Sequence, residues 1–506
     1  MKQYSGSFNK RSRLLKHPAL NEPSDARLKA LDASGLPDHL ESVLQVQNDF
    51  FPCFDWTFPP PLLSTHAPPA SASALFSHPS VEPGRYSLYL HLPFCKTLCS
   101  FCYYTVLPGR GIEQSSQYLD YLIREMGLYA PSLQGEWCES IYIGGGTPTY
   151  LDEPQLVTLI QAIRDRFHLL EDAEISIEAA PGTLSRTKLE TLKQLGVNRL
   201  SYGIQTLDEA MLATMNRHYR VADAEHELAL ALDIIGNVNV DTMYGFEHEP
   251  DGALNRTLQR FHALGIPSLS IYSLDTQRIR KGKSLSGPPR DEQYEYKIDA
   301  FSRACDQLCT LGYEPVLQNV FVQPGRGSYR HQVRRWDNLP LVSLGISAQG
   351  YAPRMPYQNV GALKPYYQLL DEDRLPIATV DPLTPEMELI REVSSCLRFT
   401  RLDLGNIQRR YGVDLDYVFG DLIATLQKLG YLQRDGDSLQ MTGKAAYYNN
   451  IIPMLFAPDA FKQQLLSLPE EYLAEYPVPQ VMVQAGSTQS AAINVQLPST
   501  YHPAPG

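Results

Sequence analysis

Cysteine is scarce in this sequence, and so are the features of secreted and membrane-spanning chains. The 506 residues include 8 cysteines, which is far below the density of a small disulfide-stabilised secreted domain. No run of about 18 apolar residues occurs, so we expect no membrane span. The N-terminal segment MKQYSGSFNKRSRLLKHPAL is basic but has no apolar core, so it does not predict a secretory signal. These absences favour a cytoplasmic protein in a reducing compartment.

An excess of positive charge is also missing. The formal net charge is −12, which argues against a nucleic-acid partner because such partners require a basic face. The hydrophobic content of 43% and the charged content of 20% are those of an ordinary globular protein. The length suffices for one large domain and a smaller one.

Composition divides the chain into four parts. Residues 1–84 are rich in Pro, Ser and Ala and predict an irregular N-terminal arm. Residues 85–380 carry the regular patterning and predict the main domain, which becomes irregular α/β after residue 275. Residues 381–455 predict a small helical domain that ends in a hairpin, like a winged helix. Residues 456–506 predict a tail that is partly disordered.

Short β-rich runs alternate with helical patterns from residue 86 onwards. Gly196 and Gly236 stand where helix C-caps belong. Six strand–helix units predict a parallel α/β structure, either a partial or complete barrel or an open doubly wound sheet. In both, ligands bind at the carboxyl ends of the strands. The expected strands are 86–92, 140–145, 174–179, 199–204, 239–245 and 268–274, with expected helices at 117–130, 153–167, 185–196 and 221–236.

Three of the cysteines are packed into one short stretch, LYLHLPFCKTLCSFCYYT. Cys95, Cys99 and Cys102 have C-x3-C-x2-C spacing and follow the first expected strand. Structural zinc requires four closed ligands, but Cys138 is distant in sequence and His91 lies on the expected strand. Three thiolates in a loop suit a [4Fe–4S] cluster with one iron left open to a substrate or a cofactor.

These motifs resemble those of the radical S-adenosylmethionine (SAM) superfamily and, within it, the oxygen-independent coproporphyrinogen III oxidase family. The cysteine loop is the superfamily signature. YLHLPFC before it, GGGTPT at 144–149 and GVNRLSYGIQTLDEAMLATMNRHY at 196–219 are more specific to the family. RHQVRRWDNLPLVSLGISAQG extends the resemblance, which covers residues 86–455.

The resemblance implies a partial (β/α)6 radical SAM barrel with a small C-terminal winged-helix-like domain. It also implies a [4Fe–4S] cluster whose open iron chelates SAM, bound as one molecule or as two. A one-electron donor such as flavodoxin or ferredoxin would reduce the cluster. The reductive cleavage of SAM would then give methionine and a 5′-deoxyadenosyl radical that abstracts hydrogen from a small-molecule substrate.

The resemblance also assigns ligand contacts, although each of these residue types taken singly is more often structural. Consecutive glycine amides can bind a charged end group, and a carboxylate can accept hydrogen bonds from ribose hydroxyls. The implied cluster ligands are Cys95, Cys99 and Cys102, and the implied SAM contacts are Tyr89, Phe101, Gly145, Gly146, Thr147, Glu178 (to the ribose), Gln205, Arg217 and Asp241.

Two basic runs, 278–283 and 329–336, stand out in this acidic chain. A solvated face explains them as well as a function does. The alternative is a carboxylate-binding patch beside the barrel mouth, in which Arg330 and Arg334 bind substrate carboxylates such as propionates. Cys305 and Cys309 share a helix face and give no strong metal signal.

The cluster loop departs from the family pattern. Coproporphyrinogen dehydrogenases typically continue it as Cys-Gly-Cys, whereas this chain has Cys102-Tyr103-Tyr104. We therefore hold three hypotheses. The first is a radical SAM enzyme acting on a porphyrinogen-like or other carboxylated aromatic. The second is a two-SAM methyltransferase or cyclopropane-forming enzyme of natural-product biosynthesis, and the third is a heme chaperone without oxidase activity.

Overall fold

The computed structural model describes residues 68–246, 249–274, 290–399, 401–442, 445 and 451–456. Most of the N-terminal arm, the basic run 278–283 and the tail after residue 456 lie outside the described residues. The chain forms two compact units, and the described parts divide between Val380 and Asp381. None of the helices in the described part combines the length and apolar character needed to cross a membrane.

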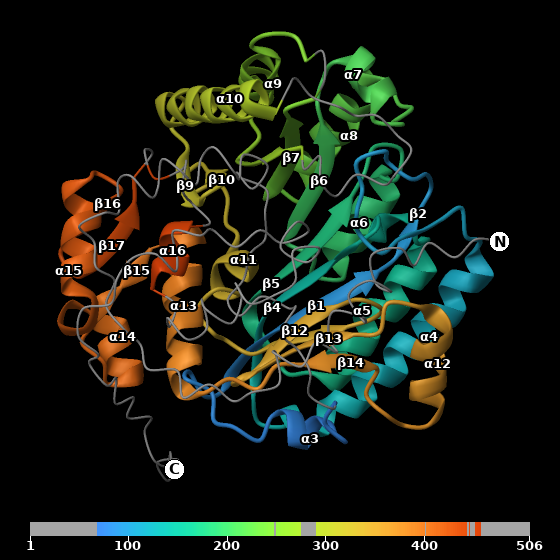
Figure 1. The fold of residues 1–506 in the computed structure, drawn as a ribbon. Coiled ribbons are helices and arrows are strands. Elements are labelled where there is room, and N and C mark those ends of the chain that lie inside the picture. The colour runs from blue at the N-terminus through green and yellow to red at the C-terminus, as the bar shows by residue number, and fades with distance from the viewer. Residues whose placement is uncertain are drawn as a thin grey trace. The chain divides into compact units, whose positions relative to one another are not determined.

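The larger unit is built on a 12-stranded sheet (Figure 1). Six of its strands are parallel and adjacent, in the order in which they occur along the chain. A doubly wound sheet would reverse its strand order at a switch point, so the partial (β/α)6 barrel is confirmed. The six strands are β1 (Arg85–Leu92), β4 (Trp137–Gly145), β5 (Leu169–Ala179), β6 (Arg199–Gln205), β7 (Val238–Tyr244) and β8 (Ser268–Ser273).

Shorter strands extend the sheet at both edges, where the sequence predicted only irregular α/β structure. On one side β11 (Leu341–Leu344) pairs parallel to β1. Three antiparallel strands follow it outwards, β12 (Gln349–Ala352), β13 (Met355–Asn359) and β14 (Ile377–Val380). On the other side β8 is followed by the antiparallel strands β10 (Val320–Val322) and β9 (Glu314–Leu317).

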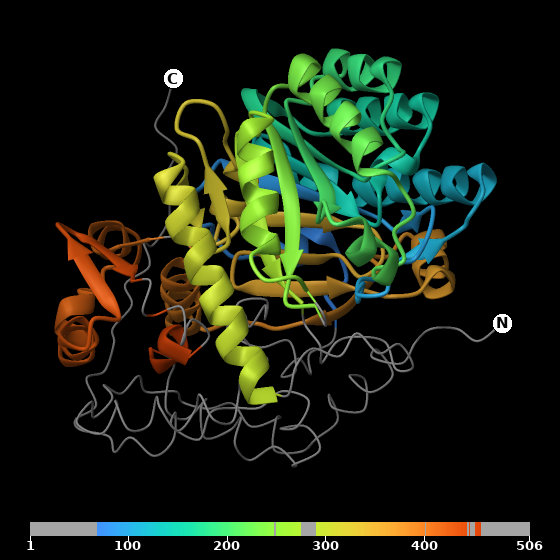
Figure 2. The same cartoon turned by 90° about the horizontal axis from the view of Figure 1, so that it is seen from above.

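A row of helices covers the outer face of the parallel strands (Figures 1 and 2). The first four helices of the row pack side by side in the order of the chain. Gly196 and Gly236 have φ of +89° and +85° directly after two of them, as the sequence predicted for C-caps. The row contains α4 (Ile112–Tyr129), α5 (Glu153–Arg166), α6 (Arg186–Gln194), α8 (Val221–Ile234) and α9 (Ala253–Ala263). The other helices of the unit are α3 (Ala72–Leu75), α7 (Glu209–Thr214), α10 (Arg290–Thr310), α11 (Arg330–Arg334) and α12 (Leu363–Asp371), with 3-10 turns at η4 (Ala130–Leu133) and η5 (Pro148–Tyr150).

The parallel strands have an apolar outer face and a polar inner face. Alternate residues such as Ile175 and Ile177 are buried against the helices, whereas Ser176 and Glu178 between them point to the other face. On that inner face, side chains of neighbouring strands bond to one another, as Ser87 Oγ and Ser140 Oγ do at 2.7 Å. Alternation therefore places a line of polar groups inside the barrel.

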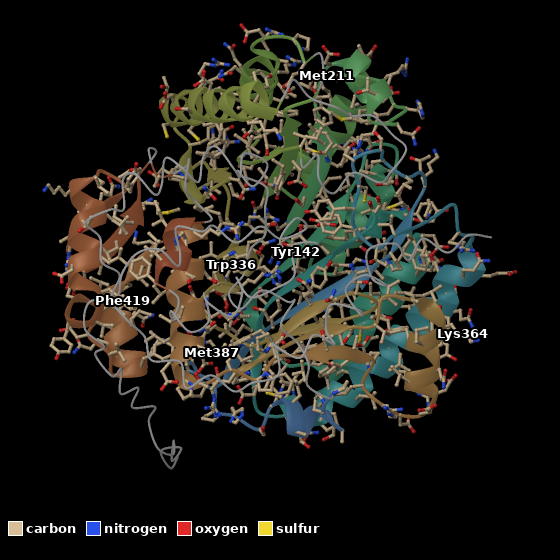
Figure 3. The ribbon with its side chains drawn as sticks, viewed as in Figure 1. Tyr142, Met211, Trp336, Lys364, Met387 and Phe419 are labelled. Carbon is tan, nitrogen blue, oxygen red and sulfur yellow. The ribbon has the colours of Figure 1, made fainter. Side chains whose placement is uncertain are left out.

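The smaller unit contains helices followed by a hairpin. Helices α13 (Pro385–Phe399), α14 (Leu404–Tyr411) and α15 (Leu415–Lys428) precede strands β16 (Leu432–Asp435) and β17 (Ser438–Met441). Strand β17 also pairs with β15 (Leu402–Asp403). Phe419, labelled in Figure 3, is buried in this unit and packs edge-to-face on Phe456, which follows α16 (Ile451–Leu455). The arrangement is the helical, winged-helix-like domain that the sequence predicted.

Candidate cofactor and active site

The three clustered cysteines lie in the loop that leaves the carboxyl end of β1. Cys95 ends the short strand β2 (Phe94–Cys95), which pairs with β3 (Leu107–Pro108) where the loop returns. Cys95, Cys99 and Cys102 are all partly exposed, so the loop opens its thiols to a ligand. A strand end of this kind is where parallel α/β folds bind ligands.

The cysteine loop is held from two sides by hydrogen bonds. Gly146 N–H donates to the Leu92 carbonyl at 2.8 Å, and Thr147 N–H donates to the Phe94 carbonyl at 2.7 Å. Thr147 Oγ1 lies 3.8 Å from Cys95 Sγ. On the far side the Asn216 side chain donates to the Leu98 carbonyl at 2.7 Å. The loop is therefore fixed between the ends of β4 and α7.

The glycine run at the end of β4, Gly144 to Gly146, makes room for the contact between this strand end and the cysteine loop. A Cβ on Gly146 would lie 2.6 Å from the Phe94 carbonyl oxygen and 2.9 Å from Cys95 Sγ. Gly145 has a φ of +115°, and a Cβ there would meet the His91 ring at 2.7 Å. Only glycine fits these positions without displacing the loop.

Glu178 is anchored at the carboxyl end of β5. Its Oε1 accepts a 2.7 Å hydrogen bond from the Tyr142 hydroxyl, and its Oε2 accepts one of 3.0 Å from Gly145 N–H. Burial raises the pKa of this carboxyl to about 7, against the lowering effect of the Tyr142 hydrogen bond. Tyr142, labelled in Figure 3, is buried among the strands of the larger unit. Glu178 is thus a fixed acceptor beside the glycine run.

Asp241 lies on the inner face of β7. It accepts hydrogen bonds from Asn239 Nδ2 at 2.8 Å and from Ser201 Oγ at 3.2 Å. Burial raises the pKa of its carboxyl, and the positive charge of Arg199 is the largest influence in the opposite direction. The carboxyl groups of Asp241 and Glu178 interact, since Asp241 also raises the pKa of Glu178.

Gln205 and Arg217 complete the carboxyl end of β6. Gln205 ends the strand with a φ of +80°, an uncommon conformation for a residue with a side chain and one typical of functional sites. Arg217 Nη1 donates to the Gly203 carbonyl, and its guanidinium carbon lies 5.7 Å from the centroid of the Phe101 ring. Burial lowers the pKa of Arg217, but Cys99 and Tyr219 together outweigh this effect, so the pKa is raised on balance. Arg217 therefore holds its charge beside the cysteine loop.

Tyr89 points along the inner face of β1 towards the cysteine loop. Its hydroxyl lies 3.0 Å from His91 Nδ1, and His91 Nε2 lies 2.9 Å from the Thr105 carbonyl. Because a carbonyl only accepts, Nε2 carries the proton and Tyr89 donates to Nδ1. Burial lowers the pKa of His91 to about 4, so the ring stays neutral and the Tyr89 oxygen is left to accept from a ligand.

Arg330 and Arg334 are not at this end of the barrel, which corrects the position we expected for them. Helix α11 lies at the amino ends of β4 and β5. Arg330 pairs with Asp172 at 2.9 Å. Arg334 pairs with Glu139 at 2.8 Å, with Glu82 at 2.6 Å and with Asp337 at 2.8 Å. Carboxylates of the chain itself engage both guanidinium groups, so neither is positioned to bind a substrate carboxylate at the mouth.

The sequence reasoning missed two residues of the inner face, Tyr142 and Arg199. Tyr142 bonds to Glu178, and Arg199 is completely buried at the start of β6. A signal for both was present, because each falls on the strand positions that alternate with the buried apolar ones.

Comparison with known proteins identifies the family to which the chain belongs. Residues 89–261 match the model of the radical SAM superfamily, and residues 383–448 match that of the HemN C-terminal domain. The oxygen-independent coproporphyrinogen III oxidase of Escherichia coli K12 is 31% identical over 399 residues, which are 73% of this chain and 85% of that protein. The chain belongs to the radical SAM family of oxygen-independent coproporphyrinogen III oxidases and their relatives.

Two further relatives show the breadth of this radical SAM family. The heme chaperone HemW of Mycobacterium tuberculosis H37Rv is 30% identical over 384 residues, 72% of this chain and 92% of that protein. The solved structure of coproporphyrinogen III oxidase (HemN) from Escherichia coli matches with a TM-score of 0.66 and 26% identity. It covers 82% of this chain and 98% of that one. The radical SAM fold predicted from the sequence is thus confirmed, and the smaller unit corresponds to the HemN C-terminal domain.

Membership of the radical SAM family implies a [4Fe–4S] cluster and SAM, and the loop fits the cluster. Within the described residues no group of three His, Cys, Asp or Glu is close enough to hold a single metal ion. A [4Fe–4S] cluster instead takes each thiolate on a different iron and spaces its ligands more widely. Burial raises the pKa of Cys95, and Cys102 and Cys99 act in the same direction, so the three thiols of the loop interact with one another.

Proposed function

We propose that this chain binds a [4Fe–4S] cluster through Cys95, Cys99 and Cys102 and binds SAM along the inner face of the barrel. When bound, the cluster would pass an electron from a flavodoxin or ferredoxin to SAM and so supply its reductive cleavage. The chain's own residues hold the ligand and exclude competing reactions. The observation that carries the proposal is the partly exposed cysteine loop, held against the glycine run beside Glu178.

The inner face offers acceptors and donors suited to the parts of SAM. Gly145, Gly146 and Thr147 present backbone beside the loop, where the amino group of SAM would lie. Glu178 accepts from the ribose hydroxyls. The other proposed contacts surround the same strand ends and the loop: Tyr89, Phe101, Gln205, Arg217 and Asp241. One SAM molecule occupies this set of residues, and a second molecule would need contacts beyond it.

The substrate we propose is a porphyrinogen-like or other carboxylated aromatic compound. The support is the family, since the E. coli relative is an oxygen-independent coproporphyrinogen III oxidase that aligns over 85% of its length. Arg330 and Arg334 no longer support it, because both are paired within the chain. The basic run 278–283 lies outside the described residues.

The test is an anaerobic reaction of the reconstituted protein with dithionite, SAM and coproporphyrinogen III, followed by mass spectrometry. We expect 5′-deoxyadenosine and methionine together with successive losses of CO₂ from the porphyrinogen. A mass gain of one carbon would identify a methyl transfer instead. Absence of 5′-deoxyadenosine with every aromatic substrate tested would refute radical SAM activity.

The heme chaperone is a second candidate, and a specific observation favours it. Tyr104 stands where the oxidase pattern described above has a further cysteine. The length of the match does not separate the two, because it covers 97% of HemW of Bacillus subtilis at 28% identity and 98% of the solved E. coli oxidase. Stoichiometric binding of heme by the reconstituted protein, with no turnover of coproporphyrinogen III, would establish this alternative.

A further inference from the structure

One arginine is buried inside the barrel with most of its hydrogen-bonding capacity unused. Arg199, the first residue of β6, is 0% exposed. Its Nε donates to the Ser328 carbonyl at 2.9 Å, and its guanidinium carbon lies 3.4 Å from the centroid of the Tyr329 ring. Both Nη atoms are buried and have no hydrogen-bond partner among the described residues. A cation removed from water in this way needs compensating negative charge nearby.

Three carboxylates share the inner face with Arg199. The buried Glu174 is linked to it through Ser328, whose Oγ donates to Glu174 Oε2 at 3.3 Å. Glu178 and Asp241 follow farther along the strands. Arg199 is the largest influence that lowers the pKa of Asp241 against burial. It also lowers the pKa of Glu178, after the hydrogen bonds from Tyr142 and Gly145.

Strand register places Arg199, Glu178 and Asp241 on adjacent strands. Arg199 pairs with Ser176 on β5, two residues before Glu178, and Asp241 on β7 pairs with Gly203, four residues after Arg199. Arg199 therefore lies nearer the amino ends of the strands than the two carboxylates do.

We propose that Arg199 is a positioning residue for SAM: a buried cation on the inner face of the barrel that supports the carboxyl groups of Glu178 and Asp241 as hydrogen-bond acceptors for the ligand. This inference rests on the proposed function, because that is what assigns Glu178 and Asp241 to SAM. Arg199 itself need not touch the ligand. Arg217 cannot replace it, since Arg217 is engaged beside the cysteine loop by the Gly203 carbonyl and Cys99.

The other groups around the two carboxylates are neutral or are hydrogen-bond donors. Burial raises the pKa of the surrounding tyrosines, which keeps them protonated. Burial lowers the pKa of His331 to about 3, with Arg335 and Arg199 acting in the same direction. The groups that face Glu178 are Tyr89, Tyr142, Gly145, Arg199, Asp241 and Tyr272. The groups that face Asp241 are Tyr142, Glu178, Arg199, Ser201, Asn239, Ser270, Tyr272 and Tyr329.

Loss of the Arg199 charge should therefore change the pKa of Glu178 and of Asp241 in a direction that can be predicted. Without it the pKa of both carboxyls rises, so a larger fraction is protonated at neutral pH. A protonated carboxyl has one acceptor oxygen fewer for the ribose and the cationic groups of SAM. Binding weakens at neutral pH and returns as the pH is raised through the new pKa.

The experiment measures the Kd of SAM for the full-length, cluster-reconstituted protein by anaerobic equilibrium dialysis at a series of pH values. For Arg199→Met we expect about tenfold weaker binding near pH 7 and a binding profile displaced to higher pH. Arg199→Lys keeps the charge and should restore most of the parent profile. Arg330→Met, which removes an arginine paired with Asp172, should leave it unchanged. Iron content should be the same in all four proteins.

The outcomes separate this inference from the proposed function. A parent protein that binds no SAM would refute the proposed function itself. A parent that binds SAM, with an Arg199→Met profile superimposable on it, would refute the role of Arg199 alone. If Arg199→Met is too unstable to assay, the double variant Arg199→Met/Asp241→Asn should unfold at a higher temperature than the single variant, because it removes both charges. A double variant no more stable than the single one would overturn the proposal.

Discussion

The Tyr142 hydroxyl donates a 2.7 Å hydrogen bond to Glu178 Oε1 across the strands β4 and β5. The other carboxylate oxygen of Glu178 accepts from Gly145 N–H, which lies in the glycine run that supports the cysteine loop. One side chain thus joins the inner face of the barrel to the turn beside the proposed cluster. A substitution at Tyr142 should therefore alter the position or the pKa of Glu178 beside the glycine run.

Tyr142→Phe tests this link. The change removes one donor and leaves the buried Glu178 with a weaker set of partners, so the pKa of its carboxyl should rise. We expect the free energy of unfolding to fall by about 1–2 kcal/mol, and SAM binding to weaken at neutral pH. Urea denaturation and equilibrium dialysis measure the two effects. Tyr150→Phe is the matched control, since Tyr150 donates to the Arg110 carbonyl at the surface. Equal losses in both variants would contradict the special role of Tyr142.

Local patterning explains why much of the fold and the site could be predicted. The alternation of Ile175 and Ile177 with Ser176 and Glu178 defines a strand, and also defines which residues face the barrel interior. The spacing of the three cysteines is a local property of one loop. Parallel strands bring their carboxyl ends to one edge, so the sequence order of Glu178 and Asp241 sufficed to place them together.

Contacts between distant segments could not be predicted in the same way. Arg334 is drawn to the amino ends of the strands by Glu139, which lies almost two hundred residues earlier along the chain. The sequence of a basic run does not show whether its side chains are solvated or are paired with carboxylates of the same chain. The edge strands β9 to β14 have only three to five residues each, which is too short for a period to be recognised.

The stability of the larger unit should depend on pH through Glu125. This residue is completely buried on α4, and its carboxylate accepts from Tyr366, Gly345 and Asn359. Burial raises its pKa from 4.5 to about 7. Between those values the folded state holds more protons than the unfolded state, so the free energy of unfolding decreases as the pH rises through this window.

Glu125→Gln should remove this contribution, which is on the order of 2–3 kcal/mol across the window. Urea denaturation between about pH 5 and pH 8 gives the slope for each protein. Glu178 contributes with the same sign, so a residual slope is expected in the variant. Glu190→Gln changes an exposed carboxylate on α6 and serves as the control. A slope that Glu125→Gln leaves untouched would show that Glu125 titrates normally.

Arg334→Ala should affect folding and leave catalysis alone. Arg334 pairs with Glu139, a carboxylate that is only 4% exposed, and its removal leaves that charge buried without its main partner. We expect a loss of about 2–4 kcal/mol in the free energy of unfolding. The Michaelis constants for SAM and for the substrate should match those of the parent below the unfolding temperature. Arg374→Ala, which breaks an exposed pair with Glu372, should cost less than about 1 kcal/mol. A raised Michaelis constant for a carboxylated substrate would contradict this prediction and would indicate that Arg334 binds the substrate.

Gly146→Ala should release the cluster without unfolding the barrel. The added methyl group would lie 2.6 Å from the Phe94 carbonyl oxygen and 2.9 Å from Cys95 Sγ, so the cysteine loop has to move away from β4. The thiols then lose their relative positions, and we expect anaerobically reconstituted protein to hold well under half the iron of the parent. The visible absorption of the cluster should fall in proportion, while the far-ultraviolet circular dichroism is retained. Gly127→Ala is the control, because a methyl group there on α4 meets no atom within 4 Å and suits a helix. Full iron content in Gly146→Ala would mean that the loop binds its cluster without support from the glycine run, and would remove the main structural reason for assigning that run to the cofactor site.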